Sequence, residues 1–285
     1  MSKFAVWKYV CPSLMALGLM SCLASPAAAQ VVVTGGLDVT NQYSFRGIRQ
    51  NTSGVSIWPY VDFGGTPFKG DGSLKSASLN VGSWNAFHSQ IHDFRNLDGD
   101  ISSNKWYESD IYATLGLGFG GGVSLGTTYT SYTSPGNYWR HIKEIAFKLG
   151  VDDSAKLGKG ALKPYGLVAF ELTDDGQADA GASKGVYVEL GIAPGYAGSK
   201  ASLAVPVKLG LSAKDYYEFG TGSDSKFGYF SIAGIVTVPA GPHFNVHGGV
   251  EVQAYGDNLK AYNAYGDSGD RAATAIGSVG IGFSY

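Results

Sequence analysis

The chain has 285 residues, of which 44% are hydrophobic and 13% aromatic, and its formal net charge at neutral pH is −2. A charge this close to zero argues against nucleic acid as a partner. The abundance of glycine (42), tyrosine (18) and phenylalanine (14) disfavours helices and favours strands, so the composition predicts an all-β protein.

Residues 1–29 have the pattern of a secretory signal peptide: two lysines precede an apolar stretch that ends in alanines at A-x-A spacing. We expect this segment to be cleaved on export and residues 30–285 to form one domain. A lipoprotein cleavage box with Cys22 as the lipidated residue is the alternative interpretation. Cys11 and Cys22 both lie in the leader, so the exported chain is expected to contain no disulfide.

Beyond residue 29 no stretch approaches the ~18 apolar residues of a transmembrane helix. Instead, about twelve runs alternate apolar and polar residues with a period of two, separated by clusters of Gly, Asp, Asn, Ser and Pro. An even number of strands is what a barrel with both chain ends on one side requires. The runs are 31–47, 53–64, 74–87, 106–119, 122–133, 140–151, 162–172, 184–194, 201–216, 227–238, 244–255 and 271–285.

Most runs have one apolar face and one polar or small face. In the last run but one, Phe244, Val246, Val250 and Val252 alternate with polar residues such as His247. An apolar outer face and a polar inner face are typical of a transmembrane barrel, whereas a soluble barrel is apolar inside. The alternation therefore predicts an up-and-down antiparallel barrel that crosses a membrane.

Connection lengths separate this barrel from a soluble β-sandwich, which would also alternate. The connections 88–105, 174–184 and 256–270 are long and polar, whereas 120–121 and 239–242 are short. Long loops on one side and short turns on the other are typical of proteins in the outer membrane of Gram-negative bacteria, where we expect this chain to reside. Its surroundings would then be outer-membrane lipid and lipopolysaccharide.

Aromatic residues on the apolar face are expected at the two membrane interfaces. The terminal run is expected to close the barrel against the first. Its last residue, Tyr285, resembles the C-terminal signal recognised by the barrel assembly machinery, which makes that machinery an expected partner. The interface aromatics are Tyr43, Phe45 and Tyr129 at one end and Phe63, Phe119, Phe283 and Tyr285 at the other.

Ionisable residues on the polar face are predicted to line the lumen. The acids among them outnumber the bases, so a water-filled lumen would prefer cations. We expect the first outer connection, near residues 49–53, to be short, with Arg46 on the strand just below it. The predicted lumen residues are Asp38, Arg46, Asp62, Glu108, Asp110, Glu144, Lys148, Glu171, Glu189, Lys208, His247 and Glu251.

These residues predict a porin-like channel for passive diffusion of small polar solutes, with no cofactor and no catalytic residues. The alternative is a plugged barrel in which the same charges pair across strands, because inward Trp58, Trp84 and Tyr187 leave little room. A non-conducting barrel could instead act as a surface adhesin or receptor through its long loops.

A lipid-modifying enzyme is the remaining alternative, and it would need a nucleophile, a base and usually a metal near the outer rim. His88 and His92 lie close in sequence to Asp93, Asp98 and Asp100 and could form such a cluster. No motif with fixed spacing accompanies them, so we predict that the chain is not an enzyme.

The stretch from Asn41 to Gln50, NQYSFRGIRQ, followed by Trp58-Pro59-Tyr60, resembles the first hairpin of the TorF-like proteins, a proteobacterial family of outer-membrane porins. Residues 80–85, 108–113 and 129–135 are similar to the next part of that family. The resemblance covers the first half of the exported chain. It implies an outer-membrane location and a pore, and it assigns no binding residues.

Overall fold

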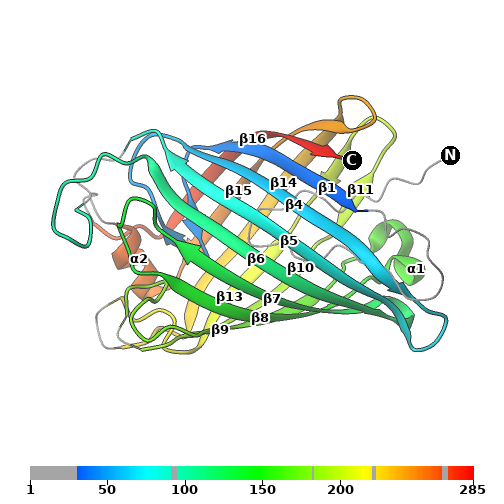
Figure 1. Cartoon of the computed structure of the whole chain (residues 1–285), viewed down its shortest axis with the longest axis horizontal. Helices are drawn as coiled ribbons and strands as arrows, with labels where there is room; N and C mark the ends of the chain where they lie inside the picture. The colour runs from blue at the N-terminus through cyan, green and yellow to red at the C-terminus, as the bar shows by residue number, and fades with distance from the viewer. Residues whose placement is uncertain (1–30, 91–94, 182, 220–222, 265–268) are drawn as a thin grey trace.

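The computed structural model describes residues 31–90, 95–181, 183–219, 223–264 and 269–285, so the expected leader lies outside it (Figure 1). The chain forms a closed antiparallel β-barrel of twelve strands, which confirms the predicted fold class. β1 (Val32–Thr40) pairs with β16 (Ala273–Ser284) and closes the sheet. Within the described residues, the helices are too short or too polar to cross a membrane.

Every other barrel strand pairs with its neighbours in the sequence. In chain order they are β4 (Ser56–Lys69), β5 (Leu74–His88), β6 (Trp106–Phe119), β7 (Val123–Thr133), β8 (Ile142–Val151), β9 (Tyr165–Glu171), β10 (Val186–Ile192) with β11 (Gly195–Ala197), β12 (Ser202–Ala204) with β13 (Val207–Lys214), β14 (Phe227–Pro239) and β15 (Phe244–Tyr255). The short helical elements α1 (Ser154–Leu157), η2 (Gly120–Gly122), η3 (Gly158–Gly160) and α2 (Asp257–Asn263) lie in the connections.

Two of the barrel strands are interrupted at prolines. β10 and β11 form one strand broken near Pro194, and β12 and β13 form the next, broken at Pro206. Proline has no backbone N–H to donate to the ladder, which explains both gaps. Antiparallel pairing continues on both sides of the gap, so the wall of the barrel remains closed.

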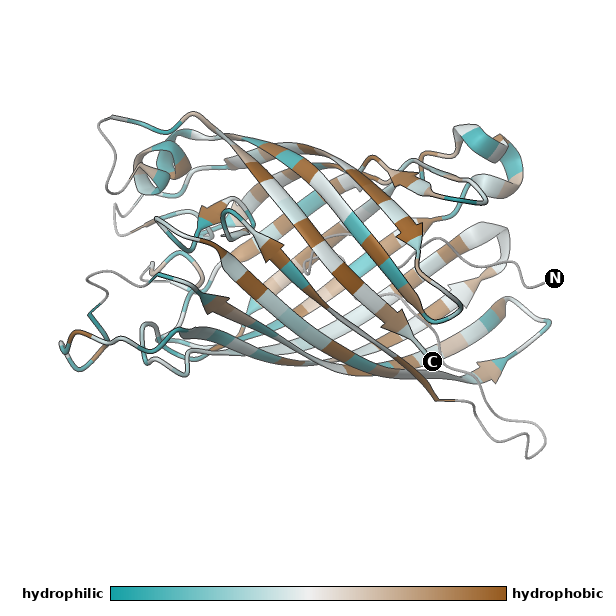
Figure 2. Cartoon of the chain, turned by 90° about the horizontal axis from the view of Figure 1, so that it is seen from above, coloured by the Kyte–Doolittle hydropathy of each residue, from teal (hydrophilic) through white to brown (hydrophobic). Residues whose placement is uncertain are grey.

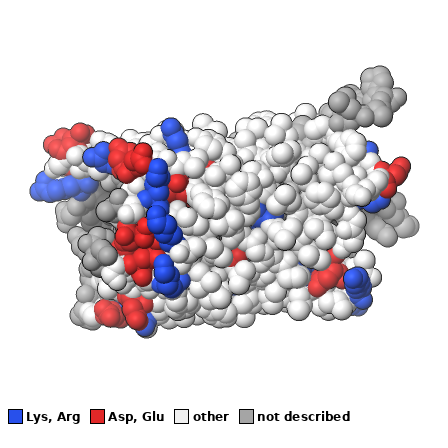
Figure 3. Space-filling view, turned by 90° about the horizontal axis from the view of Figure 1, so that it is seen from below, with Lys and Arg blue, Asp and Glu red and all other residues white. Residues whose placement is uncertain are grey.

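The alternation read from the sequence separates the outside of the barrel from the inside. On β15, Phe244, Val246 and Val250 are 45–54% exposed, whereas Asn245 and His247 between them are buried. Apolar residues recur along the strands in Figure 2, and the middle of the face drawn in Figure 3 is almost free of charged side chains. Such a surface is stable in contact with lipid, not water.

The two ends of the barrel differ. The turn end carries the short links, among them 70–73 and 240–243, together with the start of β1 and the C-terminus (Figure 1). The loop end, where α2 lies, carries the connections 41–55, 89–105, 134–141, 172–185, 215–226 and 256–272. The prediction of a short first outer connection is wrong, because β1 ends at Thr40 and fifteen residues separate it from β4.

Candidate functional site

Residues 41–55 leave the barrel wall at the loop end and fold into the interior; we call them the inserted segment. They contain a small hairpin of β2 (Ser44–Phe45) and β3 (Ile48–Arg49). Its turn consists of Arg46 and Gly47, with φ angles of 50° and 83°. Positive φ at both central residues is what a tight two-residue hairpin turn requires, and glycine meets this requirement without steric cost.

Arg46, at the tip of this hairpin, forms a buried ion pair with Glu144 of β8. Its Nη1 and Nη2 atoms donate to the two carboxylate oxygens at 2.6 and 2.7 Å, a bidentate arrangement. Nη1 also donates to the hydroxyl of Tyr216 at 2.7 Å, and the guanidinium lies 4.2 Å from the ring centroid of Tyr187. A buried charge is costly unless it is paired and hydrogen-bonded, so these contacts allow Arg46 to lie inside the barrel.

The backbone of the hairpin is held by side chains from two other loop-end connections. The Asn263 side chain of α2 donates to the carbonyl of Gly47 at 2.7 Å and accepts from the N–H of Arg49 at 2.9 Å. The Tyr217 hydroxyl donates to the carbonyl of Arg46 at 3.0 Å. The hairpin is therefore fixed through main-chain groups as well as through the ion pair.

The inserted segment also contacts different sides of the barrel wall. Ser44 Oγ donates to Gln253 Oε1 of β15 at 2.7 Å, and the Tyr107 hydroxyl of β6 donates to Gln50 Oε1 at 2.7 Å. Because β8, β6 and β15 are all reached, the inserted segment extends across the interior at the loop end.

Two buried aromatic clusters flank the inserted segment. The ring of Tyr43 lies 5.3 Å from those of Trp58 and Trp84, so the prediction that Tyr43 and Phe45 face the membrane interface is wrong: both belong to the inserted segment. Tyr129, by contrast, faces outward and is 42% exposed. The first cluster contains Tyr43, Trp58, Tyr60, Trp84, Ala86 and Tyr107, and the second contains Ile48, Ala169, Tyr187, Tyr216, Tyr217, Tyr229, Tyr255 and Leu259.

Two acids of β6, Glu108 and Asp110, lie beside the first cluster. A register shift opposite Ala86 and Phe87 places Tyr107 and Glu108 both inside the barrel, although they are adjacent in sequence. Among the described residues, neither acid has a basic side chain within ion-pair distance, and Asp110 Oδ1 has no hydrogen-bond partner. Both carboxylates are deeply buried, 5% and 6% exposed.

Below the inserted segment, toward the turn end, inward charged groups contact side chains of nearby strands. Glu189 accepts from the hydroxyls of Tyr165, Tyr187 and Tyr229 at 2.6–3.1 Å. Lys208 Nζ lies 3.6 Å from Glu251 Oε1. Carboxylates and ammonium groups in these positions keep the interior polar along its length.

The remaining predicted lumen residues have separate partners. Lys148 Nζ lies 3.9 Å from the ring centroid of Tyr165, and Glu171 accepts from two backbone N–H groups at 2.7 Å. Asp62 accepts from Asn80 and Tyr112, each at 2.7 Å. His247 Nε2 lies 2.6 Å from Asp38 Oδ1.

The structure places the side chains of all the predicted lumen residues on the inside of the barrel, buried or half-buried. One of them, Arg46, belongs to the inserted segment and not to a strand of the barrel wall. The side chains that sequence reasoning missed are Tyr216, Tyr217 and Asn263, which hold the inserted segment. The adjacent aromatics at 216–217 break the alternation of the predicted strand 201–216, a signal that could have marked a turn into the interior.

The histidines considered for the alternative metal cluster do not form one in the described part of the chain. His92 and Asp93 lie outside the described residues. His88 is buried, its Nδ1 lies 3.0 Å from Ser56 Oγ, and its ring stacks on Tyr107 at 4.4 Å. Among the described side chains, no three His, Cys, Asp or Glu residues come together to hold a metal ion.

No protein-family model matches this chain, and no curated protein matches its sequence. Solved structures with a similar fold are outer-membrane barrels. An outer-membrane channel from Pseudomonas putida F1 is 13% identical with a TM-score of 0.48, covering 92% of this chain and 97% of that one. The NanC porin is 11% identical with a TM-score of 0.44, covering 89% and 99%.

Outer membrane phospholipase A from Escherichia coli is similar to the same degree, at 12% identity and a TM-score of 0.43, covering 91% of this chain and 92% of that one. Channels and an enzyme thus share this architecture. Similarities of this strength carry no argument about function, and the function must be argued from the interior of this barrel.

Proposed function

We propose that this chain is an outer-membrane channel that lets small polar solutes and ions diffuse passively, with a lumen narrowed by the inserted segment. The observation that carries the proposal is the closed barrel with an apolar outside and ionisable side chains along its inside. The loop end faces the exterior of the cell and the turn end faces the periplasm. Tyr285 engages the assembly machinery, and residues 1–29 direct export.

The channel prefers cations. Arg46 and Lys208, two of the buried bases, are neutralised by Glu144 and Glu251. Glu189 is held by three tyrosine hydroxyls and has no basic side chain within ion-pair distance among the described residues, and carboxylates inside a low-dielectric tube raise the local concentration of cations. The resemblance of residues 41–60 to TorF-like porins agrees with this proposal.

The test is the reversal potential of the refolded protein in a planar bilayer under a potassium chloride gradient. We expect discrete conductance steps and a cation-directed reversal potential. Glu189→Gln removes an inward charge and should lower the ratio of potassium to chloride permeability. The control, Asp71→Asn in the exposed turn between β4 and β5, should leave the ratio unchanged. An anion-directed potential, or equal effects of the two variants, would contradict the proposed selectivity.

A second candidate is a non-conducting barrel that displays its loops as a receptor or adhesin. The burial of the hairpin in the inserted segment favours it: Ile48 is only 1% exposed, and the two aromatic clusters pack beside the hairpin. This candidate predicts folded, heat-modifiable protein that gives no conductance steps at any voltage. The same bilayer recordings therefore distinguish the two functions.

A further inference from the structure

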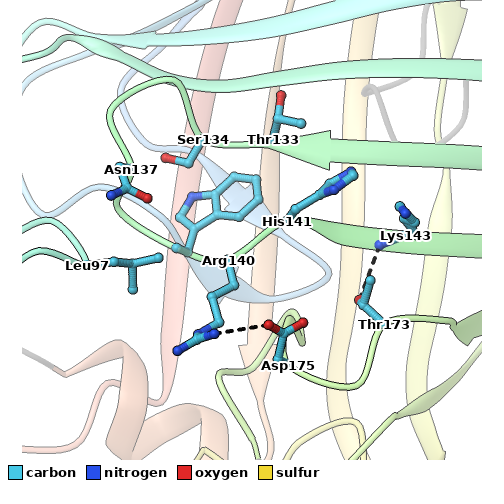
Figure 4. Close-up of a pocket in the computed structure, with 10 residues that line it drawn as sticks. Leu97, Thr133, Ser134, Asn137, Arg140, His141, Lys143, Thr173 and Asp175 are labelled. Atoms are coloured by element: carbon cyan, nitrogen blue, oxygen red, sulfur yellow. Dashed lines mark hydrogen bonds and ion pairs between the residues drawn. The ribbon is translucent and has the colours of Figure 1, made fainter.

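A groove of about 480 Å³ lies at the loop end, where side chains from three connections meet the ends of β7 and β8 (Figure 4). Three connections line it: 89–105 contributes Leu97, 134–141 contributes Asn137, Trp139 and Arg140 among others, and 172–185 contributes Thr173 and Asp175. The first residues of β8 complete it. The groove is thus built from segments that are distant in sequence.

Basic side chains concentrate in this groove. Arg140, His141 and Lys143 all line it, against one acid, Asp175, which is 3.0 Å from Arg140 Nη1. Lys143 Nζ has no carboxylate within ion-pair distance among the described residues, which leaves its charge available to a ligand. His141 Nε2 lies 2.7 Å from Ser131 Oγ and is thereby oriented at the rim. This combination suits an anion such as a phosphate.

The hydroxyl groups that line the groove are already engaged within the protein. Thr133, Ser134 and Thr173 each donate their hydroxyl to a backbone carbonyl, those of Ser109, Tyr107 and Gly176 respectively. The groove therefore offers a ligand its cations rather than its hydroxyls.

The apolar wall of the barrel begins directly below the groove. Glu144 points inward, so Lys143 and the alternate residues after it on β8 point outward. Phe147 and Leu149 are 37% and 56% exposed, and the ring of Phe147 lies 6.3 Å from that of Phe170 on β9. A ligand with a charged head and acyl chains would have its head at Lys143 and its chains on this wall.

The surface around the groove also carries basic side chains directly above the apolar wall. On the face shown in Figure 3, basic side chains lie between the acidic side chains of the loop end and the uncharged middle of the barrel. Cations at this boundary face the level of lipid phosphates when the barrel is in a membrane.

We propose that this groove binds a phosphate group of the lipopolysaccharide in the outer leaflet. Arg140 and Lys143 bind the phosphate, and the acyl chains lie against Phe147 and Phe170. This proposal and the proposed channel both require the barrel to lie in the outer membrane, but lipid binding does not depend on conductance. Binding and conductance are measured separately, so either proposal can fail alone.

The test measures binding of deep-rough lipopolysaccharide to the refolded barrel in detergent, followed by Trp fluorescence and by native mass spectrometry. The double variant Arg140→Gln/Lys143→Gln should bind roughly tenfold more weakly or worse, because charge-assisted contacts are lost. The matched control Lys184→Gln/Lys214→Gln removes two exposed loop-end lysines that do not line the groove and should bind within about twofold of the parent.

Further variants and ligands identify which group is bound and control for misfolding. Arg140→Lys/Lys143→Arg preserves the charges and should keep most of the affinity, and heat-modifiable mobility reports folding of every variant. Dephosphorylated lipopolysaccharide should bind weakly, and inorganic phosphate should compete poorly. Equal losses in groove and control variants, undiminished binding of the dephosphorylated lipid, or full competition by inorganic phosphate would overturn the proposal.

Discussion

Arg46 joins the inserted segment to the barrel wall, and its environment explains why a charge lies inside. The guanidinium is held on one side by Glu144 and on the other by the aromatic rings of Tyr187 and Tyr216. Removing one partner of such a pair leaves the other buried and uncompensated. The ion pair therefore has more effect on stability than the exposed ion pairs of the loop end.

Arg46→Ala should lower the free energy of unfolding by about 3–5 kcal/mol, because Glu144 remains buried without its partner. Arg140→Ala, in the exposed pair with Asp175, should cost only about 0–1 kcal/mol and serves as the control. Urea unfolding of the protein refolded in lipid measures both. Adding Glu144→Ala to Arg46→Ala should recover part of the loss. Equal costs for the two single variants would show that the buried pair does not hold the segment.

At this scale, sequence periodicity predicted which side chains face inward but not what they contact. Period-two alternation gives the face of Glu144 or Glu189 directly. Their partners come from elsewhere: Glu144 meets Arg46, which is distant in sequence and reaches it only because a connection folds inward. A sequence pattern that is local cannot specify a contact made across the interior of a barrel.

Among the elements, the connection 215–226 orders the aromatic residues that pack on the inserted segment. Asp224 organises it by accepting from Ser212 Oγ at 2.8 Å, from the N–H of Tyr217 at 3.2 Å and from Lys226 Nζ at 2.6 Å. Burial acts to raise the pKa of this carboxyl, but the hydrogen bonds from Lys226 and Ser212 outweigh it and hold the pKa below its ordinary value.

A lowered pKa in the folded state means that Asp224 stabilises the connection above the unfolded pKa of about 3.9, and that this stabilisation is lost as the pH falls through the lower, folded value. The Tyr217 ring resonances in an NMR titration should be constant from neutral pH down to about pH 4 and should shift below it. Asp224→Asn should show altered resonances at neutral pH. A wild-type shift between pH 7 and 5 would contradict this role.

The strands themselves were predictable because lipid and lumen impose opposite preferences on alternate residues. The predicted runs 74–87, 106–119 and 244–255 match β5, β6 and β15 almost residue for residue. The first run, 31–47, failed because Tyr43 and Phe45 continue the alternation of Leu37 and Val39 beyond Thr40. Tyr43 and Phe45 instead pack inside the barrel. Sequence periodicity does not distinguish a segment that packs inside the barrel from a strand of its wall.

For the whole molecule, the central feature is a polar tube that is closely packed at its loop end and lined by paired charges toward its turn end. In the proposed channel, the barrel wall forms the tube and the inserted segment narrows it. Conductance and the choice between a channel and a receptor thus depend on one connection, residues 41–55. The groove at Lys143 is separate from the inserted segment and is proposed to contact the surrounding lipid.

The most direct measurement compares single-channel conductance of the natural chain with that of a variant whose residues 42–54 are replaced by a short Gly/Ser linker. If the inserted segment narrows an otherwise continuous lumen, the natural chain gives small discrete steps and the variant gives steps several times larger. Folding of both is checked by heat-modifiable mobility. A folded variant that conducts no better than the natural chain would contradict the account of this barrel as a channel narrowed by its first connection.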